Sequence, residues 1–495
     1  MTLLVFLVFA AAFYGIAAAI LPPSLLGMMA APLGLVALAV IWALPEARRA
    51  PTEALTRLFS IFLGALLLWP NYIAVSVAGL PWISVRRVVA AAIFLLLLIC
   101  LSISRQYRAE TKEILKASRP ASTLFLAFLV AQVLASILSV SPFSDLPRLL
   151  ASTYTVTPMF FVALWVLGTG KRSIDWWMNW LLVYVSVLMV IGVFEYRAQH
   201  VLWAYSIPSW LHVDDDILKQ VLTPNFRDTY RVVTTFTVSL VWGELVALMM
   251  PLALHRIVNA KGVGGLAAWI LFDLALWVSA VLSGARLAVV GGITAHVVYL
   301  LLWALRRWRT DRGGLIGLSA TMIYPAFMVV FIGAIAFVPA VHNRVLGGGA
   351  TQLSNQGRQE QWALGIPAIA KRPLLGYGPG EGAGAVGWRT QGGFLSIDSG
   401  YLSTAADYGV IGFFTFFGGV VALVLMLSYQ GIFSRVSGYP PELAFAAVYV
   451  TFLTSRSVLS QGDNESLYWM LFGIGVALVY LGKRAKAAEA ADAAA

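Results

Sequence analysis

The sequence of 495 residues is poor in the side chains that metal and redox sites use, because it contains one cysteine and five histidines. A single cysteine, Cys100, excludes a disulfide within the chain. The histidines show no close pair at metal-ligand spacing and have no second cysteine beside them. We therefore expect no metal site and no cofactor. The histidines are His200, His212, His255, His296 and His342.

Charged residues are also scarce, at 12%, whereas 60% of the residues are hydrophobic. This balance excludes a water-soluble domain of this size. A spanning helix needs about 20 mostly apolar residues, and roughly fourteen such runs are present. The sequence thus predicts a single all-α domain, 1–495, a polytopic integral membrane protein with about 14 transmembrane helices. The runs are 3–21, 25–44, 59–80, 87–103, 122–140, 150–167, 177–196, 239–254, 265–282, 287–305, 315–341, 410–428, 443–458 and 467–481.

The third run is interrupted by Trp69, Pro70 and Asn71, which favour a kink or an unwound turn. The first run ends at Pro22 without a small-residue cleavage pattern, so we expect a retained helix. Lysine and arginine gather in alternate short loops, as the positive-inside rule requires of cytoplasmic loops. This pattern places both termini, including a tail at 483–495, in the cytoplasm.

The net charge of +11 is therefore mainly a topology signal, and we expect no nucleic-acid partner. Twelve cations fall on the opposite, outer side, where the same rule predicts few. We infer that this face uses positive charge for another purpose. These residues are Arg86, Arg87, Arg148, Arg227, Arg231, Arg286, Arg344, Arg358, Lys371, Arg372, Arg389 and Arg456.

Two long segments lie on the predicted outer face. The first outer loop, 197–237, contains Trp203 and Trp210, which suggest a short interfacial helix. The large outer loop, 341–409, is rich in arginine, glutamine, acids and glycine and is too long for a mere connection. Arg286 sits in the outer turn LSGAR. We expect these three sites to converge.

Several motifs resemble the O-antigen ligase and Wzy-type polysaccharide polymerase superfamily of bacterial inner membranes. They are YRVVTTFTVSLVWGELVALMMPL from Tyr230, the LSGAR turn, GRQEQWALGIPAIAKRPLLGYGPGEG from Gly357, and DSGYLSTAADYGVIGFF from Asp398. No single motif is diagnostic, but their order and outer location are specific together. The resemblance covers about 230–414; the first seven runs match only in number and hydropathy.

The resemblance implies metal-independent glycosyl transfer on the periplasmic face from a glycan linked to undecaprenyl diphosphate. It also implies membrane lipids and other polysaccharide export proteins as partners. Guanidinium groups suit a departing diphosphate because they are planar, permanently charged and rich in donors. Arg231, Arg286 and Arg358 are the expected clamp, and Arg389 is a further binding candidate. Trp362, Tyr377 and Tyr401 are candidates for stacking on sugar faces.

The chain departs from the ligase pattern at the expected general base. Ligases of the superfamily place a His-Asn pair where this chain has Asp398 and Ser399. Asp398 is then the substitute base, with Glu381 as a second candidate. The departure shifts the expectation toward a polymerase of exopolysaccharide, capsule or O-antigen, with a ligase acting on lipid A core as the alternative.

Each of these residues also has a purely structural interpretation. Arginines at helix ends commonly reach lipid phosphates, Arg358 can pin the loop through a salt bridge, and Asp398 can cap the helix that begins near Tyr401. The glycines of GYGPGEGAGAVG can hold phosphate through backbone amides, although a tight turn explains them better without a following GK[ST].

Asp273 lies well inside an apolar run and indicates a rival class. A lipid-linked oligosaccharide flippase would use such buried charges along its pathway. We see no internal repeat, however, and most outer charge lies in loops. A third alternative is a non-enzymatic partner in an export complex, in which the arginines only bind lipid.

Overall fold

A computed structural model describes residues 34, 36–47, 50–76, 83–213, 229–311, 315–339, 352–390, 393–434, 438–460 and 462–494. Within them the secondary structure is helical, apart from isolated bridges that join Ala74 to His212, Val75 to Ile83 and Arg389 to Leu395. The first predicted run and most of the second lie outside the described residues. Arg227, Arg344 and His342 lie outside them too.

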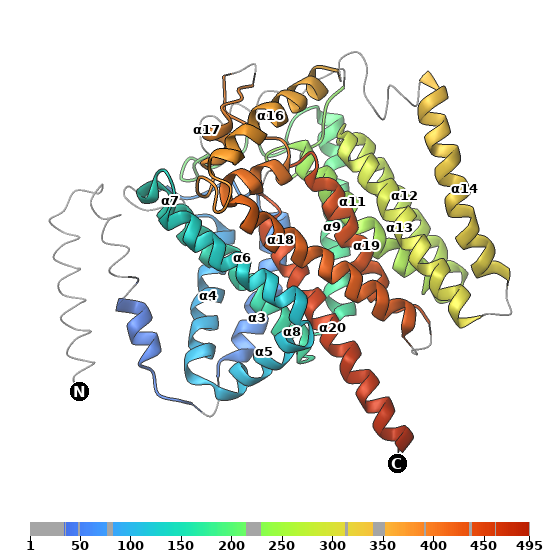
Figure 1. Cartoon of the computed structure of the whole chain (residues 1–495), viewed down its shortest axis with the longest axis horizontal. Helices are drawn as coiled ribbons and strands as arrows, with labels where there is room; N and C mark the ends of the chain where they lie inside the picture. The colour runs from blue at the N-terminus through green and yellow to red at the C-terminus, as the bar shows by residue number, and fades with distance from the viewer. Residues whose placement is uncertain are drawn as a thin grey trace.

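Sixteen helices have bounds in the described residues, and most are drawn side by side as a bundle (Figure 1). They are α3 (Thr52–Leu68), α4 (Val85–Ile103), α5 (Arg105–Ala117), α6 (Arg119–Ile137), α7 (Pro142–Thr155), α8 (Thr157–Gly168), α9 (Ile174–Ala198), α11 (Ser239–Val258), α12 (Gly262–Leu282), α13 (Arg286–Thr310), α14 (Leu315–Phe337), α16 (Gln352–Lys371), α17 (Gly382–Val386), α18 (Gly400–Phe433), α19 (Glu442–Arg456) and α20 (Glu465–Ala494).

Nine helical stretches in the described residues are long and apolar enough to cross a membrane, and each coincides with one predicted run. The chain is therefore an all-α, multi-pass membrane protein, whereas the count of fourteen spans stays a prediction. The nine are Val85–Ile103, Arg119–Ile137, Arg148–Gly168, Ile174–Ala198, Ser239–Val258, Gly262–Leu282, Arg286–Thr310, Gly400–Phe433 and Glu465–Asp492.

The third predicted run, 59–80, is wrong for residues 69–76, which are not helical, and residues 77–80 lie outside the described part of the chain. Helix α3 ends at Leu68, and Trp69 is already extended at φ −97° and ψ 124°. Pro70 explains this end, since a residue before proline is driven out of the helical region and proline itself offers no amide hydrogen. Ala74 then pairs with His212 through two backbone hydrogen bonds, so this stretch belongs to the loops.

The expected short helix at Trp203 and Trp210 is also absent from the described residues 199–213, which form turns. Pro208 lacks the amide hydrogen that a helix would need. Trp203 instead donates from Nε1 to the Tyr72 hydroxyl at 2.9 Å, and Val201 is buried in the same small cluster. The first outer loop is thus packed against the loop that follows α3.

The middle of the bundle is formed by α11 and α20, whose spanning windows are 83% and 78% buried, whereas the window of α12 is 22% buried. Aromatic side chains from several helices meet there, with the rings of Phe125 and Phe472 stacked at 5.0 Å and Phe416 at 5.8 Å from Phe472. Helix α12 is therefore at the periphery, and the central helices are held by apolar contacts on all sides.

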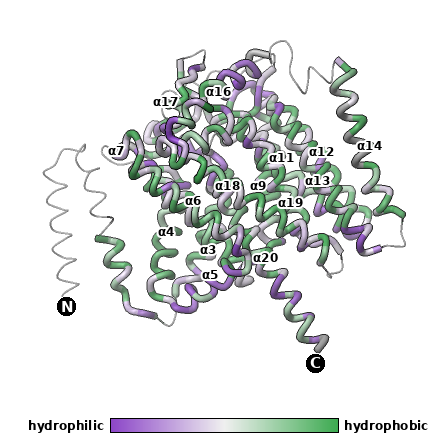
Figure 2. The backbone as a smooth tube through the Cα atoms, in the orientation of Figure 1, coloured by the Kyte–Doolittle hydropathy of each residue, from purple (hydrophilic) through white to green (hydrophobic). Residues whose placement is uncertain are grey.

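The two ends of the bundle differ. Helices α16 and α17 lie together at one end, called the α16 end here; α5 and the last residues of α20 lie at the other, called the α5 end (Figure 1). Hydrophilic residues are concentrated at both ends, and hydrophobic helical segments lie between them (Figure 2). The α16 end contains most of the large outer loop predicted from the sequence.

Candidate functional site

The segment that carries Arg231 is fixed by a buried carboxylate at the end of α9. Glu195 is fully buried and accepts hydrogen bonds from the Tyr230 hydroxyl at 3.0 Å, the Val233 amide at 2.8 Å and the Thr234 amide at 2.8 Å. Thr234 adopts the left-handed φ of 55° that this arrangement needs. Burial, and then the charge of Glu195, raise the pKa of Tyr230, which keeps its phenol a donor.

Arg231 reaches from this segment to the turn between α12 and α13. Its Nε donates to the Ser283 carbonyl at 3.3 Å, and only 9% of the residue is exposed. A Cβ on Gly284 would lie 2.9 Å from the Arg231 Cγ, and Gly284 has a φ of +59°. Gly284 of LSGAR therefore has to be glycine for two reasons. Its φ is positive, and a side chain there would collide with Arg231.

Arg286 follows this turn as the first residue of α13 and connects it to α16. Its Nη2 donates to the Asn355 Oδ1 at 3.4 Å. Arg358 lies three residues beyond Asn355, which places both on neighbouring turns of one helix face. The Arg358 Nε is buried without a hydrogen-bond partner, and no described carboxylate forms an ion pair with it. The interpretation of Arg358 as a salt-bridged pin is thus unsupported in the described residues.

Helix α16 also holds the expected base. Gln361, which is 1% exposed, accepts a hydrogen bond from the Asp398 amide through Oε1 at 2.8 Å. The Asp398 side chain is half-buried, and its Oδ1 accepts from the Ser396 hydroxyl at 3.4 Å. Contacts therefore run in sequence from Arg231 through the 283–286 turn and α16 to the backbone of Asp398. They connect the segments that carry these four residues, and their action as one site stays a prediction.

Ser399, and not Asp398, caps α18. The Ser399 side chain accepts a hydrogen bond from the Leu402 amide, and Ser399 is 1% exposed. A serine in this position satisfies a free amide at the start of the helix. The alternative in which Asp398 serves as the cap is wrong, and the Asp398 carboxylate has no capping task.

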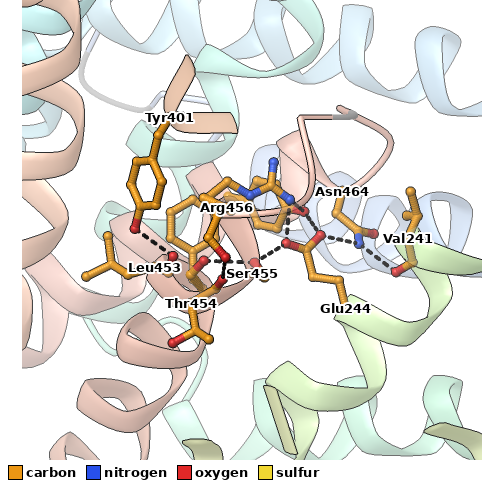
Figure 3. Close-up of polar contacts among 11 residues, drawn as sticks. Val241, Glu244, Tyr401, Leu453, Thr454, Ser455, Arg456 and Asn464 are labelled. Carbon is orange, nitrogen blue, oxygen red and sulfur yellow. Dashed lines mark hydrogen bonds and ion pairs between the residues drawn. The ribbon is translucent and has the colours of Figure 1, made fainter. Parts of the chain in front are cut away.

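A buried ionic cluster lies beneath this loop and was missed in the sequence. Glu244 of α11 is fully buried and bonds to Arg456 and Tyr468, to the Ser455 hydroxyl at 2.5 Å and to the Asn464 amide at 3.2 Å. Figure 3 shows Ser455 and Arg456 of α19 and Asn464, the residue before α20, pointing toward Glu244. Glu244 was detectable as a carboxylate within an apolar run.

Arg456 links the cluster to the Asp398 loop. A Cβ on Gly400 would lie 3.1 Å from the Arg456 Cδ and 2.8 Å from the Leu459 carbonyl, so the start of α18 rests directly on the end of α19. Ser460 also donates from its hydroxyl to the Ile397 carbonyl. The buried ion pair therefore lies below the segment that presents Asp398.

Glu381 and the glycine-rich stretch take part in packing. The Glu381 Oε1 forms an ion pair with Arg148 Nη1 at 2.6 Å. The Gly378 amide donates to the Asp407 carbonyl at 3.0 Å and the Gly382 amide to the Asp407 Oδ1 at 2.8 Å. The stretch is thus a tight turn around α18, and Glu381 is already occupied by an arginine.

The other residues predicted to bind substrate lie in different parts of the α16 end and contact their own surroundings. Arg389 donates to the Gly393 carbonyl at 2.7 Å within its own turn. Tyr377 donates to the Ala368 carbonyl at 2.8 Å, and Tyr401 to the Leu453 carbonyl at 2.6 Å, as Figure 3 shows. Trp362 is 41% exposed on α16. Of the stacking candidates in the described residues, Trp362 presents the most open ring, whereas both tyrosines are tied to the backbone.

Asp273 lies in α12 and forms an ion pair with His296 of α13, Oδ2 to Nε2, at 3.1 Å. The His296 Nδ1 lies 2.9 Å from the Gly292 carbonyl. This carboxylate is therefore compensated locally by a neighbour on the next helix. Among the described residues no three His, Cys, Asp or Glu side chains come together as a metal-ligand set; the absence of a metal in the native protein stays a prediction.

Comparison with known proteins supports the motifs in this part of the chain. Residues 271–417 match the sequence profile of the O-antigen ligase family. The matched region runs from α12 into α18 and includes Arg286, Arg358 and Asp398. No curated protein matches the chain. The match to this profile covers residues 271–417 and supports the resemblance of this part of the chain to the O-antigen ligase and Wzy-type polymerase superfamily.

Proposed function

We propose that the chain is a polysaccharide polymerase that joins undecaprenyl diphosphate-linked repeat units without a metal ion. The reaction takes place at the α16 end, which faces the periplasm of a bacterial inner membrane in this proposal. Members of the family are glycosyltransferase-like enzymes that act on lipid-linked glycans. Exopolysaccharide, capsule or O-antigen is the product class.

The observation that carries the proposal is the series of contacts from Arg231 to Asp398. Segments from three separate parts of the chain bring two arginines to one turn and a third arginine onto the helix that holds Asp398. Guanidinium groups gathered in this way stabilise a diphosphate better than a single cation does, because each offers a fork of charged donors.

In the proposed reaction an acceptor hydroxyl attacks the anomeric carbon of the donor. A new glycosidic C–O bond forms as the C–O bond to the diphosphate breaks, and undecaprenyl diphosphate leaves with the electron pair. Asp398 accepts the hydroxyl proton, and Arg231, Arg286 and Arg358 stabilise the charge on the leaving diphosphate. The aromatic face of Trp362 is open to a sugar of either substrate.

An O-antigen ligase is the alternative, and the family description favours it. Both enzymes use the same donor, so the clamp supports either, and only the acceptor differs. Asp398 and Ser399 at the position of the ligase His-Asn pair support the polymerase. A flippase is the third candidate, but its best clue, Asp273, is paired with His296.

The test uses the full chain in proteoliposomes with a lipid-linked repeat unit and a chelator. We expect chain growth, and we expect Arg286→Ala and Arg358→Ala to reduce its rate about 10²-fold or more, as the loss of one charge-stabilising donor does elsewhere. Lys371→Ala is the matched control, because it removes one cation from an exposed position on the same helix.

Three results would oppose the assignment. Full activity in both arginine variants would show that Arg286 and Arg358 do not stabilise the leaving diphosphate. An equal loss of activity in the Lys371 variant would show that the loss comes from the lower net charge and not from the position of the arginines. Transfer only to lipid A core, when both acceptors are supplied, establishes a ligase. Transport of the lipid-linked repeat without any new glycosidic bond establishes a flippase.

A further inference from the structure

A cavity lies at the α5 end, far from the site described above. It has a volume of about 840 Å³, within the range of small-ligand sites of about 300–1,000 Å³. It opens where the ends of α4 and α6 meet the short helix α5. Its charged and apolar walls are contributed by Arg108, Lys112, Lys116, Arg119, Leu126 and Phe161.

The cavity has one sign of charge, because four cations and no acid line it. The acids of α5 face the other way. Glu110 accepts from the Trp165 Nε1 at 2.9 Å and Glu113 from the Tyr480 hydroxyl at 3.0 Å. Both line a second cavity on the other side of α5, and Lys116 lies at the edge of both cavities. Helix α5 thus separates its charges, and the basic half is left facing the first cavity.

Three of the four cations are available to a ligand. Arg108 is used by the fold, since its Nη1 donates to the Leu101 carbonyl at 2.7 Å and its Nη2 forms an ion pair with Glu46 at 3.1 Å. Lys112, Lys116 and Arg119 have no hydrogen bond or ion pair with any described residue.

The start of α6 adds to the positive potential. The side chain of its capping residue, Ser118, bonds to the Ser122 hydroxyl at 2.7 Å and to no backbone amide of the first turn. Arg119, Ser122 and Thr123, near the start of α6, all line the cavity. The positive end of the helix favours an anion there, although Pro120 in the first turn has no amide hydrogen to donate. The cavity therefore combines cations, hydroxyls and a helix N-terminus at one place.

An apolar stripe continues from the cavity along α6. Leu126 is 37% exposed, Val130 58%, Val133 44% and Ile137 62%, and the spacing of these residues places them on the same helix face as Arg119 and Thr123. A phosphate ion would use only the basic end of this surface. A molecule with a phosphate head and a long apolar tail would use all of it.

We propose that this cavity binds an anionic phospholipid from the leaflet at the α5 end. The phosphate lies among Lys112, Lys116 and Arg119, the Thr123 hydroxyl contacts the headgroup, and the acyl chains follow the stripe from Leu126 to Ile137. Basic pockets between spanning helices recognise anionic headgroups in this way. This second lipid site would fix the α5 end in the membrane independently of the glycan donor.

The experiment compares the double variant Lys112→Gln/Arg119→Gln with the matched control Lys483→Gln/Arg484→Gln. The control removes the same charge from the same end, but from the second cavity. Full-length protein in neutral detergent is titrated with dioleoylphosphatidylglycerol, and bound lipid is counted by native mass spectrometry. We expect the first pair to weaken binding roughly 30-fold, because each cation contributes a factor of about five, and the control to change it less than about threefold.

Two further arms separate the possible ligands. Dioleoylphosphatidylcholine should bind at least tenfold more weakly, and inorganic phosphate at the same concentration should not displace the anionic lipid. Leu126→Asn, which keeps every charge, should weaken lipid binding as well. Equal losses in both double variants, equal binding of the two lipids, or displacement by phosphate alone would each overturn the proposal. If the double variant does not fold, lipid binding by the Leu126 variant and the displacement experiment with inorganic phosphate still test the proposal.

Discussion

At the scale of single residues, neighbours in the sequence have separate tasks. Ser399 caps the first turn of α18. Asp398, one residue earlier, is held through its backbone amide by Gln361 and by a long hydrogen bond of 3.4 Å from the Ser396 hydroxyl to its carboxylate. The Asp398 backbone is therefore fixed, while its carboxylate forms neither a helix cap nor an ion pair with a described residue. Glu381 shows the opposite case, since its ion pair with Arg148 uses the charge that a base would need.

Replacing Asp398 by asparagine should reduce chain growth about 10²–10⁴-fold, the usual contribution of a general base, with little change in melting temperature. Ser399→Ala should do the reverse and lower the free energy of unfolding by about 1 kcal/mol, because it removes only the cap. Rates in proteoliposomes and thermal unfolding in detergent measure the two effects. Similar activity losses in stable forms of both variants would contradict this division of roles.

The Glu244–Arg456 pair should matter chiefly for stability. Glu244→Ala leaves a buried guanidinium without its carboxylate and should lower the free energy of unfolding by about 3–5 kcal/mol. The double variant Glu244→Leu/Arg456→Met should recover most of this loss, since it removes both charges. Glu53→Ala is the control, because its ion pair with Arg57 is exposed and should contribute less than about 1 kcal/mol.

No recovery in the double variant would mean that the individual hydrogen bonds of Ser455, Asn464 and Tyr468, and not the balance of charge, hold α11 against α19 and α20. Reversible unfolding in the same detergent is required for each comparison.

At the scale of elements, the least predictable helix is α16. Its sequence, QLSNQGRQEQWALGIPAIAK, includes Pro367 and two glycines and has no apolar face, so it was assigned to a loop. It is helical because its partners are specific: Ala368 packs with Ile397 and Leu402 in a small separate core, and a Cβ on Gly365 would lie 2.6 Å from Leu402. Such a helix depends on contacts that no local pattern displays.

The hydrogen bonds between Glu195, at the end of α9, and the segment 230–235 lead to a second prediction about elements. Glu195→Gln keeps an acceptor but places an amide against a row of backbone donors, so the segment that presents Arg231 should loosen. We expect the KM for the lipid-linked donor to rise roughly tenfold, since a hydrogen bond to a charged group contributes about 1.5–3 kcal/mol, and kcat to change much less.

Glu195 is a positioning residue in this account, and Glu46→Gln is the control, because Glu46 lies at the other end of the bundle beside Arg105. A fall in kcat with an unchanged KM would indicate that Glu195 acts in the chemical step. An unchanged KM and kcat would show that Arg231 needs no such support.

At the scale of the whole molecule, hydropathy was sufficient for the all-α class and for the approximate positions of the nine candidate spans found in the described residues. The approach of Arg231, Arg286 and Arg358 could be expected from motifs that lie on one predicted face. The ion pair of Glu244 with Arg456 could not, because it joins residues 212 positions apart through helix packing that the sequence does not encode locally. The same holds for Arg148 and Glu381.

The orientation of the bundle is a prediction of the charge bias, and cysteine labelling checks it. In a Cys100→Ser background, a single cysteine at the exposed Ala363 of α16 should react with a membrane-impermeant maleimide added to spheroplasts. A cysteine at the exposed Ala488 of α20 should react only after permeabilisation. The reverse pattern would place the α16 end in the cytoplasm and exclude periplasmic transfer.

The distance along the chain between Glu244 and Arg456 also sets the order of events during synthesis. At roughly 5–20 residues per second, α11 enters the bilayer about 10–40 s before its arginine has been translated. During that interval the acid in α11 has no cation from α19 to meet, and an unpartnered acid is costly in hydrocarbon. The lower half of the site therefore assembles last, and a ribosome that stalls before α19 leaves a protein with its donor-binding turn but without the support beneath Asp398.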